Sequence, residues 1–290
     1  MRVSRVVIVI NPAKIHARRT GEALKALLDR HGVKQEWRDA FPPSSRLFPK
    51  LKDLRQTEAD LIIACGGDGT LLQAAHRSRG SGVPILGINI GYLGFITSVP
   101  GHKVKSAMRR ILEGDYVISL RIALDIEAET DGDVARGWAL NDVVIARGAN
   151  PHLIALNARI GAQRLTKYRC DGLVVATPTG STAYSLSAGG PIVSPECSVL
   201  TVTPICPHSL TNRPVVINAT ETIELRLERG SGEGTVQADG MDISRVASSS
   251  IVRVSTSDDS VPIAFLPEVN YYDILGEKLG WTGDGLKTGT

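Results

Sequence analysis

A single carboxylate stands among glycines directly after an apolar run. Residues 61–65 are apolar, and residues 66–70 read Gly-Gly-Asp-Gly-Thr. Glycines permit close backbone approaches that side chains forbid, and the amides at the start of a following helix attract anions. An ordinary aspartate is ionised at neutral pH, so Asp68 could accept a proton from an attacking hydroxyl or bind a metal. The alternative is a strand-to-helix turn that Asp68 caps; the flanking glycines and Thr70 favour a functional site.

A second block of polar residues follows in the other half of the chain. Residues 168–172 read Tyr-Arg-Cys-Asp-Gly, and residues 177–191 carry six Ser and Thr hydroxyls between positions 177 and 187. Many hydrogen-bonding groups with little bulk suit a polar ligand that carries sugar hydroxyls; the alternative is a Ser/Thr-rich turn. An acyl-transfer role for Ser181 is not favoured, because the second glycine of a nucleophile elbow and a His/Asp partner are missing.

Other candidate groups are less specific. Asn141 and Asp142 precede the apolar residues 143–145, where they form either a turn or an amide and a carboxylate for a ribose or base. The six histidines lack the spacing of a metal site, so we expect no metal fixed by the protein. Neither a P-loop nor a G-x-G-x-x-G fingerprint is present.

Strand and helix patterns alternate over the first hundred residues, and they place these motifs. Apolar runs typical of buried strands occur at 6–10, 61–65 and 83–90. Helical periodicity occurs at 17–31, 71–79 and 104–113. This alternation predicts an α/β domain with a parallel, doubly wound sheet, and it places the glycine-rich turn at a strand-to-helix junction.

Near residue 117 the sequence pattern changes to short apolar runs separated by Gly, Asn, Asp and Ser. This pattern predicts a β-rich, sandwich-like C-terminal domain. We divide the chain into an α/β domain over 1–118 and a β-rich domain over 119–265. The remaining segment, 266–290, is expected to pack back on the α/β domain, with a frayed end.

Composition narrows the class of protein. Lys and Arg total 33 against 30 Asp and Glu, a net charge of +3, and aromatic residues make up 4% of the chain. Neither figure favours a nucleic-acid partner. Four cysteines without paired spacing indicate reduced thiols, and no apolar run approaches the roughly 20 residues of a membrane span. We expect a soluble, cytoplasmic protein without a membrane partner.

Together the motifs resemble those of the NAD kinase family. The resemblance runs in order from about residue 6 to residue 275 and rests on 66–70, 89–95 (Asn-Ile-Gly-Tyr-Leu-Gly-Phe), 141–142, 171–172, 177–191, 207–210 and Arg213-Pro214. Lipid kinases and phosphofructokinases carry close variants of the first motif, whereas the run at 177–191 is far more specific. The chain length resembles the bacterial branch.

The resemblance implies transfer of the terminal phosphate of ATP, or sometimes of inorganic polyphosphate, to the adenosine-ribose 2′-hydroxyl of NAD, giving NADP. It also implies a divalent cation, Mg²⁺ carried with the nucleotide, and self-association as a dimer or tetramer. Asp68 would be the general base, with Gly66, Gly67 and Thr70 in the phosphate loop. The residues that would contact NAD are Gly69, Phe95, Asn141, Asp142, His152, Arg169, Asp171, Thr182, Ala183, Tyr184 and Ser187.

Two positions depart from the family's pattern. Asp142 stands where Glu is common, which shortens the reach of the carboxylate, and Met241 stands where Gln is frequent, which removes a hydrogen-bonding amide.

Two other functions remain as alternative hypotheses. A lipid kinase of the diacylglycerol type would share the glycine-rich loop but need an acyl-chain pocket. A non-catalytic NAD(P)-sensing protein would bind the dinucleotide without forming an ATP-dependent product.

Overall fold

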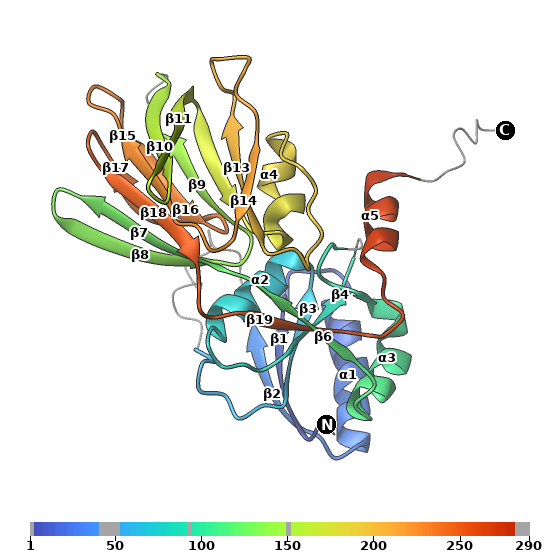
Figure 1. The fold of residues 1–290 in the computed structure, drawn as a ribbon. Coiled ribbons are helices and arrows are strands. Elements are labelled where there is room, and N and C mark those ends of the chain that lie inside the picture. The colour runs from blue at the N-terminus through green and yellow to red at the C-terminus, as the bar shows by residue number, and fades with distance from the viewer. Residues whose placement is uncertain (1–2, 41–52, 92–93, 149–151, 282–290) are drawn as a thin grey trace. The chain divides into compact units, whose positions relative to one another are not determined.

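The computed structural model describes residues 3–40, 53–91, 94–148 and 152–281. The chain divides into two compact units: unit 1 comprises residues 1–119 and 262–290, and unit 2 comprises residues 120–261 (Figure 1). The sequence placed the end of the β-rich domain at residue 265, whereas strand β19 (Val261–Phe265) pairs in parallel with a strand of unit 1. A short apolar strand is compatible with either sheet, so the sequence of β19 does not indicate which unit it belongs to.

Unit 1 is built on a sheet with the strand order β2-β1-β3-β4-β19-β6, and β5 pairs with β4 outside this order. The strands are β1 (Arg5–Ile10), β2 (Lys34–Asp39), β3 (Leu61–Gly66), β4 (Ile85–Asn89), β5 (Val99–Pro100) and β6 (Val117–Arg121). β1 pairs in parallel with β2 and β3, and β3 pairs in parallel with β4, which confirms the predicted parallel sheet. Sequence reasoning missed β2 because this edge strand is half-exposed and polar.

Unit 1 contains the three helices expected near residues 17–31, 71–79 and 104–113, together with a 3-10 helix and a C-terminal helix that the sequence analysis did not predict. They are α1 (Ala17–Arg30), α2 (Asp68–Arg77), the 3-10 helix η2 (Gly101–Lys103), α3 (Val104–Leu112) and α5 (Tyr271–Leu279). α1 and α3 share one apolar core with β1 and β3, in which Leu24, Met108 and Ile63 are buried, while α2 packs against β3 and β4 (Figure 1). No helix within the described ranges combines the length and apolarity needed to cross a membrane.

Unit 2 confirms the predicted β-rich sandwich. One antiparallel sheet has the order β11-β10-β15-β18-β7-β8, and the other has the order β14-β13-β12-β9-β16-β17. The strands are β7 (Leu124–Thr130), β8 (Asp133–Ala139), β9 (Asp142–Arg147), β10 (Ile154–Ile160), β11 (Gln163–Cys170), β12 (Gly172–Ala176), β13 (Val199–Ile205), β14 (Val215–Asn218), β15 (Ile223–Leu227), β16 (Gly234–Ala238), β17 (Met241–Val246) and β18 (Ile251–Thr256). A shared core fills the sandwich, with Val143, Leu156 and Val252 fully buried. The 3-10 helix η3 (Thr179–Thr182) and the short helix α4 (Tyr184–Ser187) follow β12.

Candidate functional site

The side chain of Asp68 holds the segment that follows β4. Asp68 is the first residue of α2, and Gly67 is the N-cap of that helix. Oδ2 of Asp68 accepts from the backbone N–H of Phe95 at 2.7 Å, and Oδ1 accepts from the N–H groups of Ile96 at 3.2 Å and Thr97 at 3.0 Å. The Thr97 hydroxyl donates to the same Oδ1 at 3.0 Å. Asp68 therefore does more than begin the helix: it fixes the backbone of residues 95–97.

These hydrogen bonds leave the two carboxylate oxygens of Asp68 unequal. A carboxylate oxygen offers about two lone pairs. Oδ1 has three donors and is saturated, whereas Oδ2 has one donor among the described residues. The position of Asp68 at the first turn of α2 also suits a negative charge, because helix N-termini carry partial positive charge. Oδ2 is therefore the oxygen that can accept a proton.

The glycines of residues 66–70 serve two different purposes. A Cβ on Gly66 would lie 2.0 Å from the Thr70 hydroxyl oxygen, so Gly66 permits the tight turn itself, and Thr70 is buried. Around Gly67 and Gly69 an added Cβ would meet nothing within 4 Å. The open side of the loop therefore lies at Gly67 and Gly69, where a ligand could approach the backbone.

Gly94 has a related role on the facing segment. A Cβ there would lie 2.0 Å from Asp68 Oδ1 and 2.3 Å from the Thr97 hydroxyl oxygen. Glycine at this position is what lets the segment wrap around the carboxylate. The neighbouring residue, Phe95, is half-buried, and the ammonium of Lys278 lies 5.5 Å from its ring centroid. A cation over an aromatic face is an attractive contact, so α5 steadies this side chain.

In unit 2, Asp239 organises the turn that carries Asn141 and Asp142. Its carboxylate accepts from the N–H groups of Leu140 at 2.8 Å, Asn141 at 2.8 Å and Asp142 at 3.1 Å. The turn between β16 and β17 places it there, with positive φ at Asp239 and Gly240. The side-chain oxygen of Asn141 is buried and has no hydrogen-bond partner among the described residues. Because an unpaired buried acceptor is costly, Asn141 Oδ1 is the group in unit 2 most in need of a ligand.

Asp142 is nearly inaccessible to solvent, with 5% of its surface exposed. Burial, followed by the nearby charge of Asp239, raises the pKa of Asp142 to about 7, against the opposing effect of a hydrogen bond from the backbone N–H of Tyr184. Desolvation and a like charge both penalise the ionised form. This carboxyl group therefore changes charge near neutral pH.

The segment 177–187 packs directly on the Asn141 turn. The Thr177 N–H donates to the Asn141 carbonyl at 2.9 Å, and a Cβ on Gly180 would lie 2.0 Å from that same oxygen. The tertiary structure thus brings these two predicted motifs together. Tyr184 and Ser187 are exposed, while Thr182 and Ala183 are half-buried.

Four of the six hydroxyls expected to serve a ligand are instead used inside unit 2. One is that of the half-buried Thr182, which donates to the Thr179 carbonyl at 3.3 Å, and the other three belong to fully buried residues. The hydroxyl of Thr177 donates to the Leu140 carbonyl at 2.7 Å, and that of Ser181 donates to the Pro178 carbonyl at 2.7 Å. Ser185 shares a hydrogen bond of 3.1 Å with Thr203. Thr177, Ser181 and Ser185 are fully buried, so the expectation that this run presents its hydroxyls to a sugar is wrong for these three residues.

Asp171 lies at the opposite end of β12 from the Asn141 turn. β12 pairs with β9 so that Ala176 faces Asp142 and Gly172 faces Ala146, which separates the two ends by roughly 16 Å. Asp171 forms a half-exposed ion pair of 2.8 Å with Arg147. Ile154 pairs with Cys170, so the neighbouring residues Arg169 and His152 lie near this same end of β12. Both of these side chains are exposed. The structure does not bring Asp171 next to Asn141 within unit 2.

Two residues of these sites were missed from the sequence. Thr97 lies just beyond the glycine-containing motif at 89–95, and its residue type alone does not indicate a contact with Asp68. Asp239 was passed over although an Asp-Gly pair between two strands indicates a tight turn. Met241 follows that turn, is half-buried and pairs with Ala238.

Comparison with family models gives two matches in chain order. The model for the ATP-NAD kinase N-terminal domain matches residues 13–116, and the model for the ATP-NAD kinase C-terminal domain matches residues 140–265. Together they cover most of the chain and both units.

Comparison with individual proteins agrees with the family models. An NAD kinase of Chlorobium phaeobacteroides is 37% identical over 276 residues, which are 94% of this chain and 96% of that protein. An NAD kinase of Symbiobacterium thermophilum is 41% identical over 226 residues, 78% of this chain and 80% of that protein.

Two solved structures share the fold. The crystal structure of yeast NADH kinase complexed with NADH has a TM-score of 0.83 at 24% identity, with coverage of 100% of this chain and 91% of that one. An NAD kinase from Archaeoglobus fulgidus in complex with ATP has a TM-score of 0.72 at 25% identity, with coverage of 96% of this chain and 100% of that one.

Proposed function

This chain belongs to the NAD kinase family and phosphorylates NAD, and from that premise we propose that Asp68 is the general base of the reaction. The observation that carries the proposal is the asymmetry of its carboxylate: Oδ1 is saturated by three donors, while Oδ2 keeps an acceptor site. The alternatives, a lipid kinase or a non-catalytic sensor, are not favoured, because the matched family and relatives are NAD kinases.

In the proposed step, the 2′-hydroxyl oxygen of the adenosine ribose attacks the terminal phosphorus of ATP. The new O–P bond forms as the bond to the leaving oxygen breaks, and the electron pair of that bond stays with ADP. The hydroxyl proton passes to Asp68 Oδ2. Phosphoryl transfer depends mainly on positioning and charge neutralisation, so a rigidly held base at a glycine-rich turn is sufficient machinery.

The open backbone at Gly67 and Gly69 supports their proposed role beside the transferring phosphate. N–H groups at the start of α2 would donate to its oxygens. Gly66 and Thr70 support this loop by forming its turn. The Mg²⁺ that balances the phosphate charge is proposed to enter bound to ATP as part of the substrate. Among the described residues no three His, Cys, Asp or Glu side chains gather as a metal site.

In unit 2 we assign the adenosine end of NAD to the Asn141 turn and the segment that packs on it. Asn141 Oδ1 would accept from the ligand, and Asp142, protonated or ionised, would meet a ribose hydroxyl or the base. Thr182, Ala183, Tyr184 and Ser187 supply the adjoining surface. Arg169, Asp171 and His152 are proposed as a separate group of NAD contacts, and Phe95 as a contact in unit 1. Self-association as a dimer or tetramer belongs to the same proposal.

The test is an assay of purified protein with NAD and Mg²⁺, in which ATP and inorganic polyphosphate are offered separately as donors. NADP is the expected product, and a parallel assay with a diacylglycerol in place of NAD should give none. Loss of NADP formation in Asp68→Asn, with the fold intact by circular dichroism, supports the general base. Near-normal turnover of that variant would remove Asp68 from the role.

A further inference from the structure

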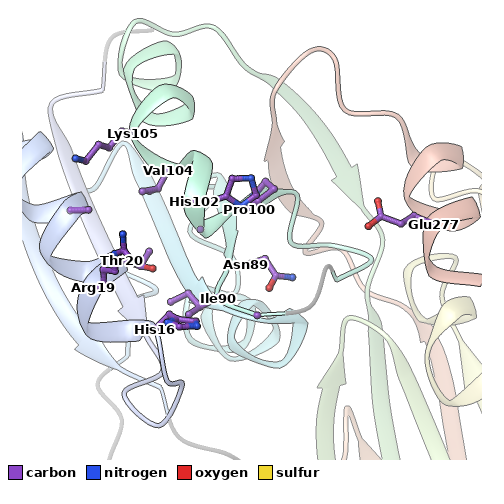
Figure 2. Close-up of a pocket in the computed structure, with 13 residues that line it drawn as sticks. His16, Arg19, Thr20, Asn89, Ile90, Pro100, His102, Val104, Lys105 and Glu277 are labelled. Carbon is purple, nitrogen blue, oxygen red and sulfur yellow. The ribbon is translucent and has the colours of Figure 1, made fainter.

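Unit 1 contains a cavity of about 810 Å³ on the side of the sheet covered by α1 and α3. Its walls are the first turn of α1, the end of β4 and the start of α3 (Figure 2). The carboxyl ends of parallel strands form the edge where open α/β sheets bind their ligands, and β4 ends at Asn89 on this edge. The cavity therefore lies where a ligand of this fold is expected.

Two cationic side chains and two imidazole groups around the cavity favour an anion. Arg19 and His16 come from α1 and its N-cap, while His102 and Lys105 come from η2 and α3 (Figure 2). All four are exposed, and none forms an ion pair within the part of the chain that the structure describes. Glu277 of α5 also contributes to the lining.

The two helices add to this preference. Neither α1 nor α3 has an acidic residue in its first turn or a side-chain cap at its N-terminus. Helix N-termini carry partial positive charge that such residues would otherwise offset. Arg19 of α1 and Lys105 of α3 supply positive charge from two helices, which suits a chain of phosphates better than a single one.

The cavity adjoins the glycine-rich loop through a short series of hydrogen bonds. Asn89, which lines it, donates from Nδ2 to the Thr97 hydroxyl at 3.1 Å, and that hydroxyl donates to Asp68 Oδ1 at 3.0 Å. The next residue, Ile90, donates its N–H to the Gly66 carbonyl at 2.7 Å. Asn89 and Ile90 thus join the lining of the cavity to the segment and the loop that hold the proposed base.

From this juxtaposition we propose that the cavity binds the phosphate chain of the phosphoryl donor, with Arg19 of α1 and Lys105 of α3 as its main contacts. The inference rests on the proposed function and names the residues that recognise the donor. The shared chemistry is a linear phosphate chain, whether the triphosphate of ATP or an inorganic polyphosphate.

The test compares the double variant Arg19→Gln/Lys105→Gln with the matched control Arg18→Gln/Arg109→Gln. The control removes the same charge from the same two helices at exposed positions that do not line the cavity. Calorimetry would measure the binding of tripolyphosphate and of ATP without turnover, and steady-state assays would give KM for ATP and for NAD. The double variant should bind both phosphate compounds at least about tenfold more weakly and leave the KM for NAD within twofold.

Several results would overturn the proposal. Unchanged binding of tripolyphosphate, or an equal loss in the control, would mean that the cavity does not hold the phosphate chain. A raised KM for NAD alone would assign the cavity to the other substrate. Weaker binding of ATP but not of tripolyphosphate would point to the nucleoside. If the wild-type protein forms no NADP, the proposed function fails separately, because the calorimetry needs no reaction.

Discussion

Thr97 donates two hydrogen bonds to a single oxygen of Asp68, one from its backbone N–H and one from its hydroxyl, both at 3.0 Å. The same hydroxyl accepts from Asn89 Nδ2 at 3.1 Å. The hydroxyl of Thr97 therefore joins the proposed general base to the end of β4. Both Thr97 and Asn89 are buried, so water cannot easily replace either partner.

Replacing Asp68 with Asn should lower kcat by about 10²- to 10⁴-fold, because the amide cannot take up the proton. It should also lower the free energy of unfolding by about 1–3 kcal/mol, because an NH₂ group would face backbone N–H donors of residues 95–97. Turnover and urea denaturation measured on the same preparation would separate the two effects.

Replacing Thr97 with Val should reduce kcat while Thr97→Ser restores most of it. The valine side chain is similar in shape but leaves Asn89 Nδ2 and Asp68 Oδ1 without the hydroxyl between them. We expect a loss of about 1–3 kcal/mol in stability for the valine variant and a smaller one for serine. If serine and valine behave alike in kcat, the hydroxyl does not position Asp68.

The stability of the protein should fall as pH rises toward neutrality because of Asp142. Its folded-state pKa of about 7 lies above the ordinary value of 3.8, so between these values the folded protein binds a proton that the unfolded chain has lost. The free energy of unfolding should therefore decrease from pH 4 to pH 7, by up to about 4 kcal/mol, and level off above pH 7.

The Asp142→Asn variant tests this pH dependence. It removes the titration and should flatten the profile, so that it is more stable than the wild type at pH 8. Urea denaturation at several pH values measures this, with Asp133→Asn, at an exposed position of β8, as the control that should keep the wild-type slope. A wild-type profile without any decrease in this interval would contradict the assigned environment of Asp142.

Two glycine substitutions should separate a ligand-facing glycine from a packing glycine. Gly69→Ala adds a methyl group into open space within α2, so stability should stay the same or rise by up to about 1 kcal/mol, while the KM for ATP rises or kcat falls. Gly180→Ala places its Cβ 2.0 Å from the Asn141 carbonyl oxygen and should instead destabilise unit 2. Thermal denaturation and NADP formation would be measured for both; full activity of Gly69→Ala would argue against a phosphate at that backbone.

The sequence predicted most of the fold because its local signals agree with the tertiary structure. Buried parallel strands need continuous apolar runs, and β1, β3 and β4 have them. The edge strand β2 was missed because a half-exposed strand needs no such run. The boundary at residue 265 groups β19 with the β-rich domain, whereas β19 pairs with β4 of unit 1. Strand pairing depends on which strand lies alongside in space, and an apolar run of five residues does not encode that.

The candidate site was likewise predicted only in part from the sequence. Asp68, Asn141 and the run at 177–191 were found from the sequence, because their residue types and order carry the chemistry and the family resemblance. Only the tertiary structure decided how they are used. In that structure the side chains of Thr177, Ser181 and Ser185 are buried. Thr97 donates to Asp68, and Asp239 accepts from the backbone of the turn that carries Asn141. Hydrogen bonds between residues far apart in the chain depend on packing, and no local pattern specifies them.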